Sequence, residues 1–216
     1  MFEMISNNII YLIIFMLAAF LIGGIPFGFL IGKWNGKDIR KEGSCNIGAT
    51  NVTRVVGKWW GKLCFLLDFL KGTLPVLAAI NAPVEDPQGL LPAATAFAVV
   101  AGHIWPVYLK FKGGKGVATA AGAFHPLCWP ALLTALTVWV IAFLTSRYVS
   151  LASILAAVIF PITAFLFYTL FPGIGPGSAC LAPILLLSIL TIYKHRSNIT
   201  RLLNGTENRF EKRKSE

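Results

Sequence analysis

The sequence predicts an all-α integral membrane protein: a seven-helix transmembrane bundle with its N-terminus outside and its C-terminus in the cytoplasm. Of its 216 residues, 56% are hydrophobic and only 13% are charged, whereas a soluble domain usually carries about 25% charged residues. Six apolar runs have about the length that spans a bilayer. The basic residues gather in alternate loops, and this bias sets the expected orientation.

The apolar runs define most of the helices in chain order. Five of them contain no acidic or basic residue other than histidine: 12–30, 90–109, 127–145, 149–171 and 179–193. A sixth run, 63–80, holds one acid and one base, Asp68 and Lys71. The first run reads as a retained helix rather than a signal peptide, because no positive charge precedes it and no small-x-small cleavage site follows a short core.

The basic residues indicate which loops face the cytoplasm. Of the 19 Lys and Arg, seven lie in 33–62, three in 110–115, one is Arg147 and seven lie in 194–214. The intervening loops 81–89, 124–126 and 172–178 contain none. This is a positive-inside pattern. Topology and attraction to anionic lipid therefore explain most of the net charge of +10 without nucleic acid.

Charge alternation also requires a crossing that hydropathy alone does not show. Residues 116–124 are too few to span as an ideal helix, so we expect a short or tilted helix buried by its neighbours. Counting it gives seven crossings. Six, with this segment re-entrant, would put the basic tail outside. The whole chain, 1–216, is expected to form one transmembrane domain with cytoplasmic loops and a short basic C-terminal tail.

Polar and basic residues coincide in four segments of the expected cytoplasmic face: 43–54, 110–116, 146–147 and 195–201. Their convergence predicts a site for an anionic ligand beside the acyl-chain region. Gly113-Gly114-Lys115-Gly116 resembles a phosphate nest, in which backbone N–H groups and a lysine face an anion. The same turn can also be a hinge with a topological lysine.

Several candidate residues allow two interpretations. Ser44, Asn46 and their neighbours in 43–54 can serve as caps and turn formers or as donors to a polar ligand. Asp68 and Lys71 share a helix face, as a functional pair or as a structural ion pair. His103 stands alone and is more typical of a structural hydrogen-bonder.

Two common catalytic patterns are absent from the sequence: H-x-x-x-x-D and the G-x-S-x-G nucleophile elbow. The four cysteines, residues 45, 64, 128 and 180, show no metal-ligand spacing and are read as small apolar fillers, with a disulfide between Cys128 and Cys180 left open.

The chain resembles the bacterial membrane glycerol-3-phosphate acyltransferases that use acyl phosphate as donor. The resemblance rests on GSCNIGATNVTRVVGK (43–58), LDFLKGTLPV (67–76), GHIWPVYLKFKGGKGVAT (102–119), SRYVSLASI (146–154) and HRSNITRLLNGTENR (195–209). It implies transfer of a fatty acyl group to the 1-hydroxyl of glycerol 3-phosphate, giving lysophosphatidic acid and phosphate. It implies no cofactor. It also implies a protein of the bacterial inner membrane with its active site on the cytoplasmic face. The apolar helices of the protein would take the acyl tail from the bilayer.

The resemblance also implies roles for individual residues. The catalytic residues would be Ser44, Arg54, His195 and Asn198, with proton removal left to His195 or to the leaving phosphate. The substrate-binding residues would be Asn46, Gly113, Gly114, Lys115, Gly116, Ser146 and Arg147. Glu207 would be structural. One position departs from the family's pattern, since Cys45 stands where glycine is common.

Two other classes of function fit parts of the sequence. A permease for an organic phosphate also needs basic groups in a helix bundle, but it places its site near the midplane in broken helices. A non-catalytic membrane scaffold with a lipid-binding tail would fit Lys212 to Lys214 but leaves the motif loops without a role.

Overall fold

The computed structural model describes residues 2–210, and every regular element in that range is helical. In chain order the elements are α1 Phe2–Gly24, α2 Phe27–Trp34, α3 Ala49–Val55, α4 Lys58–Ile80, α5 Leu90–Ile104, a 3₁₀ turn η1 Val107–Leu109, α6 Val117–Ser146, α7 Val149–Leu170, α8 Ser178–Lys194 and α9 Arg196–Leu203.

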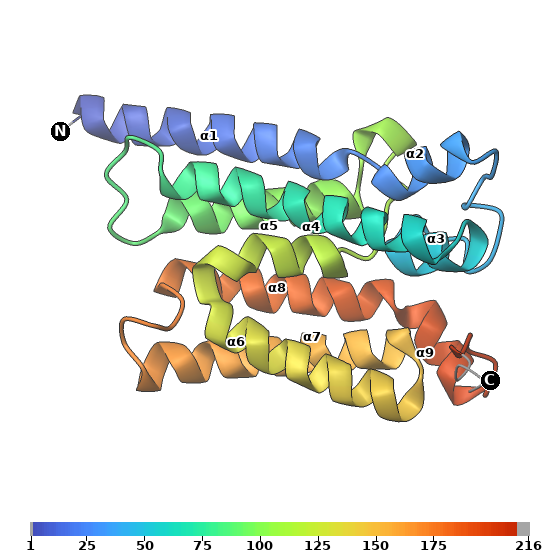
Figure 1. The fold of residues 1–216 in the computed structure, drawn as a ribbon. Helices are drawn as coiled ribbons and strands as arrows, with labels where there is room; N and C mark the ends of the chain where they lie inside the picture. Colours follow the sequence, from blue (N-terminus) through green and yellow to red (C-terminus); the bar gives the residue numbers. More distant parts are fainter. Residues whose placement is uncertain (1, 211–216) are drawn as a thin grey trace.

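The long helices run along a common axis, with the described ends of the chain at opposite ends of the bundle (Figure 1). Helix α5 packs against α1, α4, α6 and α8, and α6 packs against α4 and α7. Glycines let some backbones meet closely. A Cβ added at Gly102 would lie 2.0 Å from the carbonyl oxygen of Phe20, and one at Gly122 would lie 2.0 Å from that of Phe69. These contacts fix α1 against α5 and α4 against α6.

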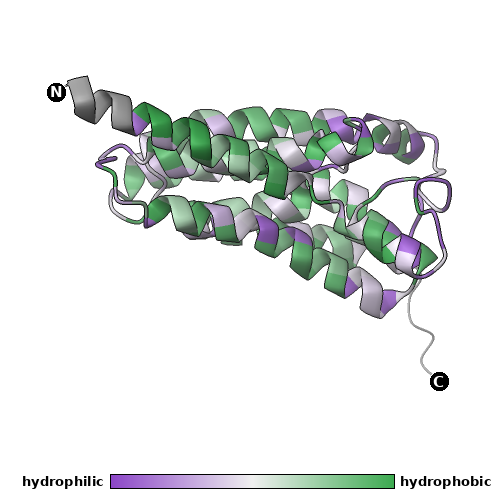
Figure 2. Ribbon diagram, turned by 90° about the horizontal axis from the view of Figure 1, so that it is seen from above, coloured by the Kyte–Doolittle hydropathy of each residue, from purple (hydrophilic) through white to green (hydrophobic). Residues whose placement is uncertain are grey.

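The surface of the bundle is suited to lipid. Five segments are long and apolar enough to cross a membrane, or six if the bent pair α8 and α9 is taken as one span. Large apolar side chains point outward along them; Leu17, Leu133 and Ile141 are each more than half exposed. Figure 2 shows hydrophobic residues along the bundle and hydrophilic ones in the loops at both of its ends. The end that carries the C-terminus also carries the short helices α3 and α9 (Figure 1) and is called the polar end below. The protein is an integral membrane protein with several spans.

The first and sixth helices break where the chain loses backbone donors. Helix α1 ends at Gly24, and α2 starts after Pro26, as the Gly-Gly-x-Pro sequence suggests. Helix α6 is interrupted at Cys128, which has non-helical backbone angles between Pro126 and Pro130. Its two halves run in opposite directions (Figure 1). A short helix before residue 127 and a separate one after it were expected from charge alternation, and the structure has this break.

Hydropathy misplaced some helix boundaries. The loop expected over 33–62 contains α3 and the first turn of α4, which begins at Lys58. Helix α5 stops at Ile104 instead of reaching residue 109, because Trp105 precedes Pro106, and a residue before proline disfavours the helical region. The polar helix α9 was also not expected. These segments face the polar end of the bundle, where hydropathy gives no helical signal.

Candidate active site

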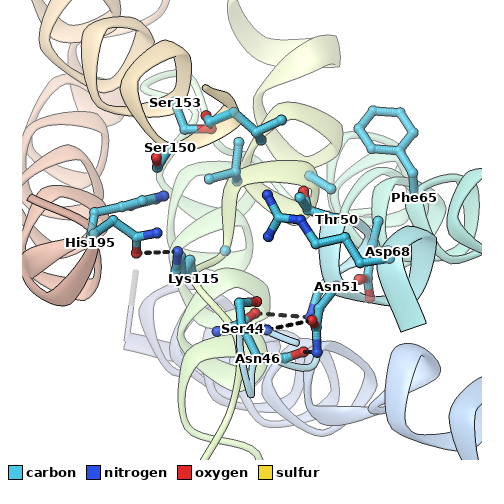
Figure 3. Close-up of a pocket in the computed structure, with 18 of the residues that line it drawn as sticks. Ser44, Asn46, Thr50, Asn51, Phe65, Asp68, Lys115, Ser150, Ser153 and His195 are labelled. Atoms are coloured by element: carbon cyan, nitrogen blue, oxygen red, sulfur yellow. Dashed lines mark hydrogen bonds between the residues drawn. The ribbon is translucent and has the colours of Figure 1, made fainter. Parts of the chain in front are cut away.

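A pocket of about 160 Å³ opens at this polar end, where three of the four predicted polar segments meet. Side chains from the loop after α2, the glycine-rich loop, α7 and the C-terminal region point into it from several sides (Figure 3). Its polar lining residues are Ser44, Asn46, Thr50, Asn51, Arg54, Asp68, His103, Lys115, Ser150, Ser153, His195, Asn198 and Glu207. Two cations, Arg54 and Lys115, therefore share one cavity, which suits an anion.

Asn51 holds the first polar loop in shape. Its Oδ1 accepts a hydrogen bond from the backbone N–H of Ser44 at 2.8 Å. Its Nδ2 shares its hydrogens among the carbonyls of Ile39, Glu42 and Asn46 at 2.8, 3.1 and 2.9 Å. The side chain is only 1% exposed. Asn51 therefore acts on the backbone, and it places Ser44 at the pocket wall.

A chain of polar contacts links the glycine-rich loop to the C-terminal region. Lys115 Nζ donates to Asn198 Oδ1 at 2.6 Å, and Asn198 Nδ2 donates to Glu207 Oε1 at 2.7 Å. Ser150 Oγ donates to the same Glu207 oxygen at 2.9 Å, while Arg201 Nε donates to Oε2 at 2.7 Å. Because the Asn198 amide nitrogen faces the carboxylate, its oxygen must face Lys115.

The surroundings of these groups affect the charged forms of Lys115 and Glu207 in opposite ways. Burial lowers the pKa of Lys115 to about 8, although the carboxylate of Glu207 acts in the opposite direction. Burial also opposes ionisation of Glu207, but hydrogen bonds from Asn198, Arg201 and Ser150 outweigh it and lower the pKa of this carboxyl. Lys115 is thus a cation with few hydration partners, which is the kind of group that binds a phosphate strongly.

His195 lies in the turn between α8 and α9 with its ring buried in the pocket wall. Its Nδ1 is 2.8 Å from the carbonyl oxygen of Thr191. A carbonyl can only accept, so Nδ1 carries the hydrogen and, in the neutral ring, Nε2 is left with a free lone pair. The imidazole can therefore accept a proton or a hydrogen bond through Nε2.

The glycines of 113–116 bring the loop backbone onto His103. Gly114 N donates to the His103 carbonyl at 3.1 Å, and a Cβ at Gly114 would lie 2.1 Å from His103 Nε2. Gly116 has a φ of +83° and ends the loop at the N-terminus of α6, where Val117 and Ala118 line the pocket. A helix N-terminus of this kind favours an anion.

Asp68 and Lys71 form a buried ion pair beneath the pocket, with Oδ1 and Nζ 2.8 Å apart and both side chains 3% exposed. Lys71 Nζ also donates to the carbonyl of Ile25, 2.7 Å away, in the break between α1 and α2. His103 Nδ1 lies 3.7 Å from Asp68 Oδ1. Asp68 and His103 line the pocket, whereas Lys71 does not. The contacts of Lys71 are those of a structural ion pair.

The structure brings most of the predicted site residues together: Ser44, Asn46, Arg54, Lys115, Gly116, His195, Asn198 and Glu207 all line the pocket. Gly113 and Gly114 pack behind it on His103. Ser146 and Arg147 lie outside the lining. The hydroxyl of Ser146 donates to the carbonyl of Ala142 at 2.5 Å and so belongs to the end of α6.

Sequence reasoning missed Ser150 and Ser153, which lie one helical turn apart near the start of α7 and line the pocket. Their spacing of three residues, in the first two turns of a largely apolar helix, was the available signal. Trp139 was also missed, because an aromatic residue in an apolar span has no distinctive pattern.

A second pocket, of about 110 Å³, lies between α6, α7 and α8 and is almost entirely apolar. Its lining includes Phe124, Leu132, Leu136, Phe160, Ile184 and Leu187. Val117, Trp139 and Ser153 line both pockets. A polar cavity with two cations thus lies next to an apolar one among the membrane-spanning helices.

All four cysteines are free, so Cys128 and Cys180 form no disulfide, and three of the four agree with the expected filler role. Cys64, Cys128 and Cys180 are buried, and only Cys45 is exposed. Among residues 2–210, no group of His, Cys, Asp and Glu side chains has the arrangement of a metal site.

Comparison with known proteins gives consistent results. The family model described as glycerol-3-phosphate acyltransferase matches residues 13–205. The glycerol-3-phosphate acyltransferase of Aquifex aeolicus is 47% identical over 93% of this chain and 98% of its own length, and that of Syntrophotalea carbinolica is 48% identical over 92% and 97%.

Two crystal structures of PlsY, an integral membrane glycerol 3-phosphate acyltransferase, superpose well. Its glycerol 3-phosphate form gives a TM-score of 0.82 at 44% identity over 93% of this chain and 96% of that one. Its lysophosphatidic acid form gives a TM-score of 0.80 at 44% identity over 93% and 95%. This chain belongs to the glycerol-3-phosphate acyltransferase family and is a membrane-embedded acyltransferase.

Proposed function

We propose that the protein transfers a fatty acyl group from acyl phosphate to the 1-hydroxyl of glycerol 3-phosphate. The products are 1-acylglycerol 3-phosphate, which is lysophosphatidic acid, and inorganic phosphate. This is the first acylation step of phospholipid synthesis. The observation that carries the proposal is the junction of the two pockets at Val117, Trp139 and Ser153. A donor with an anionic head and an apolar tail fits such a junction, with the reactive carbonyl between the two.

The reaction does not require a covalent enzyme intermediate. The 1-hydroxyl oxygen attacks the acyl carbonyl carbon, a new ester C–O bond forms, and the bond to phosphate breaks with the electron pair leaving on phosphate. Arg54, Lys115 and the N-terminus of α6 stabilise the negative charge on the two phosphate-bearing substrates. Holding both substrates in one cavity supplies much of the remaining rate enhancement.

The hydroxyl proton goes either to the leaving phosphate or to His195 Nε2, which the Thr191 contact leaves free to accept. Ser44, Asn46 and Asn198 contribute hydrogen bonds to the substrates. Glu207 is structural, since its three side-chain hydrogen bonds hold Asn198, Ser150 at the start of α7 and Arg201 near the end of α9.

We further propose seven crossings, with the two halves of α6 counted separately, the N-terminus outside and the pocket at the cytoplasmic face of a bacterial inner membrane. The position of the pocket at one end of the bundle also disfavours an organic-phosphate permease, whose site is expected near the midplane.

The reaction is tested with purified protein in detergent, supplied with a long-chain acyl phosphate and glycerol 3-phosphate. We expect lysophosphatidic acid and phosphate in equal amounts. Arg54→Gln and Ser44→Ala should each abolish most of the activity, while Leu203→Ala, at an exposed position on α9, should not. Folded protein that forms no product overturns the proposal. Formation of the product from acyl-CoA but not from acyl phosphate overturns only the choice of donor.

The orientation is tested with the native thiol of Cys45, the one exposed cysteine of the four. A membrane-impermeant maleimide should label inverted vesicles and leave intact spheroplasts unlabelled. Gln88→Cys, in the loop at the other end of the bundle, should show the reverse. Labelling of Cys45 from outside contradicts the topology.

A further inference from the structure

Residues 207–210, the C-terminal strap, cross from α9 to the turn between α6 and α7. Two residues of the strap donate hydrogen bonds to backbone carbonyls of that turn. Phe210 N donates to the carbonyl of Arg147 at 3.1 Å. Arg209 Nε donates to the carbonyl of Ser146 at 3.1 Å. These contacts fix the path of the strap along the rim of the polar pocket, since its first residue, Glu207, lines that pocket.

Aromatic contacts add to this attachment. The Phe210 ring packs edge-on against Phe143 near the end of α6, with ring centroids 5.9 Å apart. The guanidinium of Arg209 lies 5.7 Å from the centroid of the Tyr148 ring. The position of the Phe210 ring is therefore set by its backbone hydrogen bond and by a second aromatic ring.

The side chain of Arg54 reaches this strap from α3. Arg54 Nη2 donates to the carbonyl of Asn208 at 3.2 Å. Its guanidinium carbon lies 5.0 Å from the centroid of the Phe210 ring, within the range of a cation–π contact. Both groups are neutral, and no carboxylate in the described part of the chain lies within ion-pair distance of Arg54. The strap thus orients the guanidinium while leaving its charge available to an anion.

We propose that Phe210 is a positioning residue for Arg54, and that the strap sets the affinity of the site for the phosphate-bearing substrate that Arg54 binds. This inference rests on the proposed function. The strap carries Glu207 at one end and Phe210 at the other. It therefore holds Lys115 through Asn198 and Arg54 through its ring, and so fixes the two cations relative to each other.

A double-mutant cycle tests the coupling. KM is measured for acyl phosphate and for glycerol 3-phosphate in Phe210→Ala, Arg54→Gln and the double variant. Losing a cation–π contact should raise KM roughly 3- to 30-fold, for the same substrate whose KM rises in Arg54→Gln, with a smaller change in kcat. In the Arg54→Gln background, Phe210→Ala should add less than about twofold, because coupled residues are not additive.

Matched variants separate positioning from simple packing. Phe210→Leu keeps an apolar contact with Phe143 but has no ring, and we expect it to behave like Phe210→Ala. Phe210→Tyr keeps the ring and should restore KM. Phe171→Ala removes another phenylalanine that contacts a second ring, that of Phe167, at the opposite end of the bundle, and should change neither constant. Multiplicative effects in the cycle, or a normal KM in Phe210→Leu, overturn the proposal.

The proposed reaction and the strap can fail separately. If the wild-type protein makes no lysophosphatidic acid from acyl phosphate, the proposed reaction is wrong. The same cycle is then run on the dissociation constant for inorganic phosphate, measured by calorimetry in detergent. Weaker binding in Phe210→Leu that disappears in the Arg54→Gln background supports the strap. Unchanged binding in Phe210→Leu overturns it.

Discussion

The ammonium group of Lys115 lies 2.6 Å from the side-chain oxygen of Asn198, whose amide nitrogen is held by Glu207. The carboxylate of Glu207 thereby determines, through Asn198, how the ammonium group of Lys115 is oriented in the pocket that both residues line. Lys115 and Asn198 are 83 residues apart, so this relationship depends on the packing of α6, α7 and α9 around the pocket.

Replacing Glu207 with Gln should lower kcat/KM by roughly 10- to 150-fold. The neutral amide loses the charge-assisted hydrogen bonds from Arg201 and Asn198, each worth about 1.5–3 kcal/mol, and Asn198 is then free to rotate away from Lys115. Steady-state kinetics measure the loss, with thermal unfolding of each variant as a check on folding. Glu85→Gln, in the loop far from the pocket, is the control. A folded Glu207→Gln variant within twofold of wild type contradicts the prediction.

The activity should decline as pH rises through about 8. Burial lowers the pKa of Lys115 to about 8 in the empty pocket, so the lysine is charged below that pH and neutral above it. Because kcat/KM reports ionisations of the free enzyme, it should fall above about pH 8. A bound anion stabilises the charged lysine, so kcat should persist to higher pH.

The matched variant for this profile is Lys115→Arg, because a guanidinium stays protonated in this range. Whatever its absolute activity, its kcat/KM should show no decline near pH 8. The same decline in Lys115→Arg would assign it to another group.

Cys45→Gly should stabilise the protein by up to about 1 kcal/mol. Cys45 has a φ of 55°, a left-handed conformation that costs an L-residue about 1–2 kcal/mol. Glycine removes this cost, but its greater conformational freedom in the unfolded chain offsets about 0.5–1 kcal/mol of the gain. The thiol is exposed, so kinetic constants should stay within twofold. Thermal unfolding in detergent measures the difference.

The neighbouring Gly43 provides the opposite test. Its φ is +62°, and a Cβ there would lie 2.3 Å from Asn51 Oδ1. Gly43→Ala should therefore destabilise the protein and disturb the loop. A destabilised Cys45→Gly variant would mean that the thiol side chain itself contributes to the fold.

Removing one partner of the buried Asp68–Lys71 pair should cost roughly 3–5 kcal/mol, because the other charge is left unpaired. Asp68→Asn and Lys71→Met should each lower the unfolding temperature strongly, and the double variant should be no less stable than either. Asp38→Asn breaks an exposed pair with Arg40 and should leave the unfolding temperature almost unchanged. A Lys71→Met variant as stable as wild type would contradict a structural role for this pair.

The sequence predicted the helical membrane fold and the meeting of Ser44, Arg54, Lys115 and His195, because charge bias identifies which loops share a membrane face. It named Ser146 and missed Ser150, which lines the pocket instead. The two serines lie on either side of the turn between α6 and α7, and which of them reaches the pocket depends on how α7 packs against α6 and α8. Asn51 was interpreted as a turn residue or a ligand donor. Its hydrogen bonds to the carbonyls of Ile39, Glu42 and Asn46 depend on the folded path of the loop, which the sequence does not reveal.

The short helices α3 and α9 escaped prediction for a related reason. Each lies at the polar end, and α9 is held by tertiary contacts such as that between Arg201 and Glu207. Isolated helices of seven or eight residues have little stability of their own. The local sequence therefore gives almost no signal that predicts them.

The hydrogen bonds of Asn51 to Ile39, Glu42, Ser44 and Asn46 have a consequence for the thermodynamics of ligand binding. Fixing the backbone of one residue costs about 1–2 kcal/mol of conformational entropy. In this loop the conformational entropy is lost when the chain folds, and not again when a substrate binds. A substrate that reaches Ser44 meets a preorganised wall, so its intrinsic binding energy remains available for lowering the activation barrier.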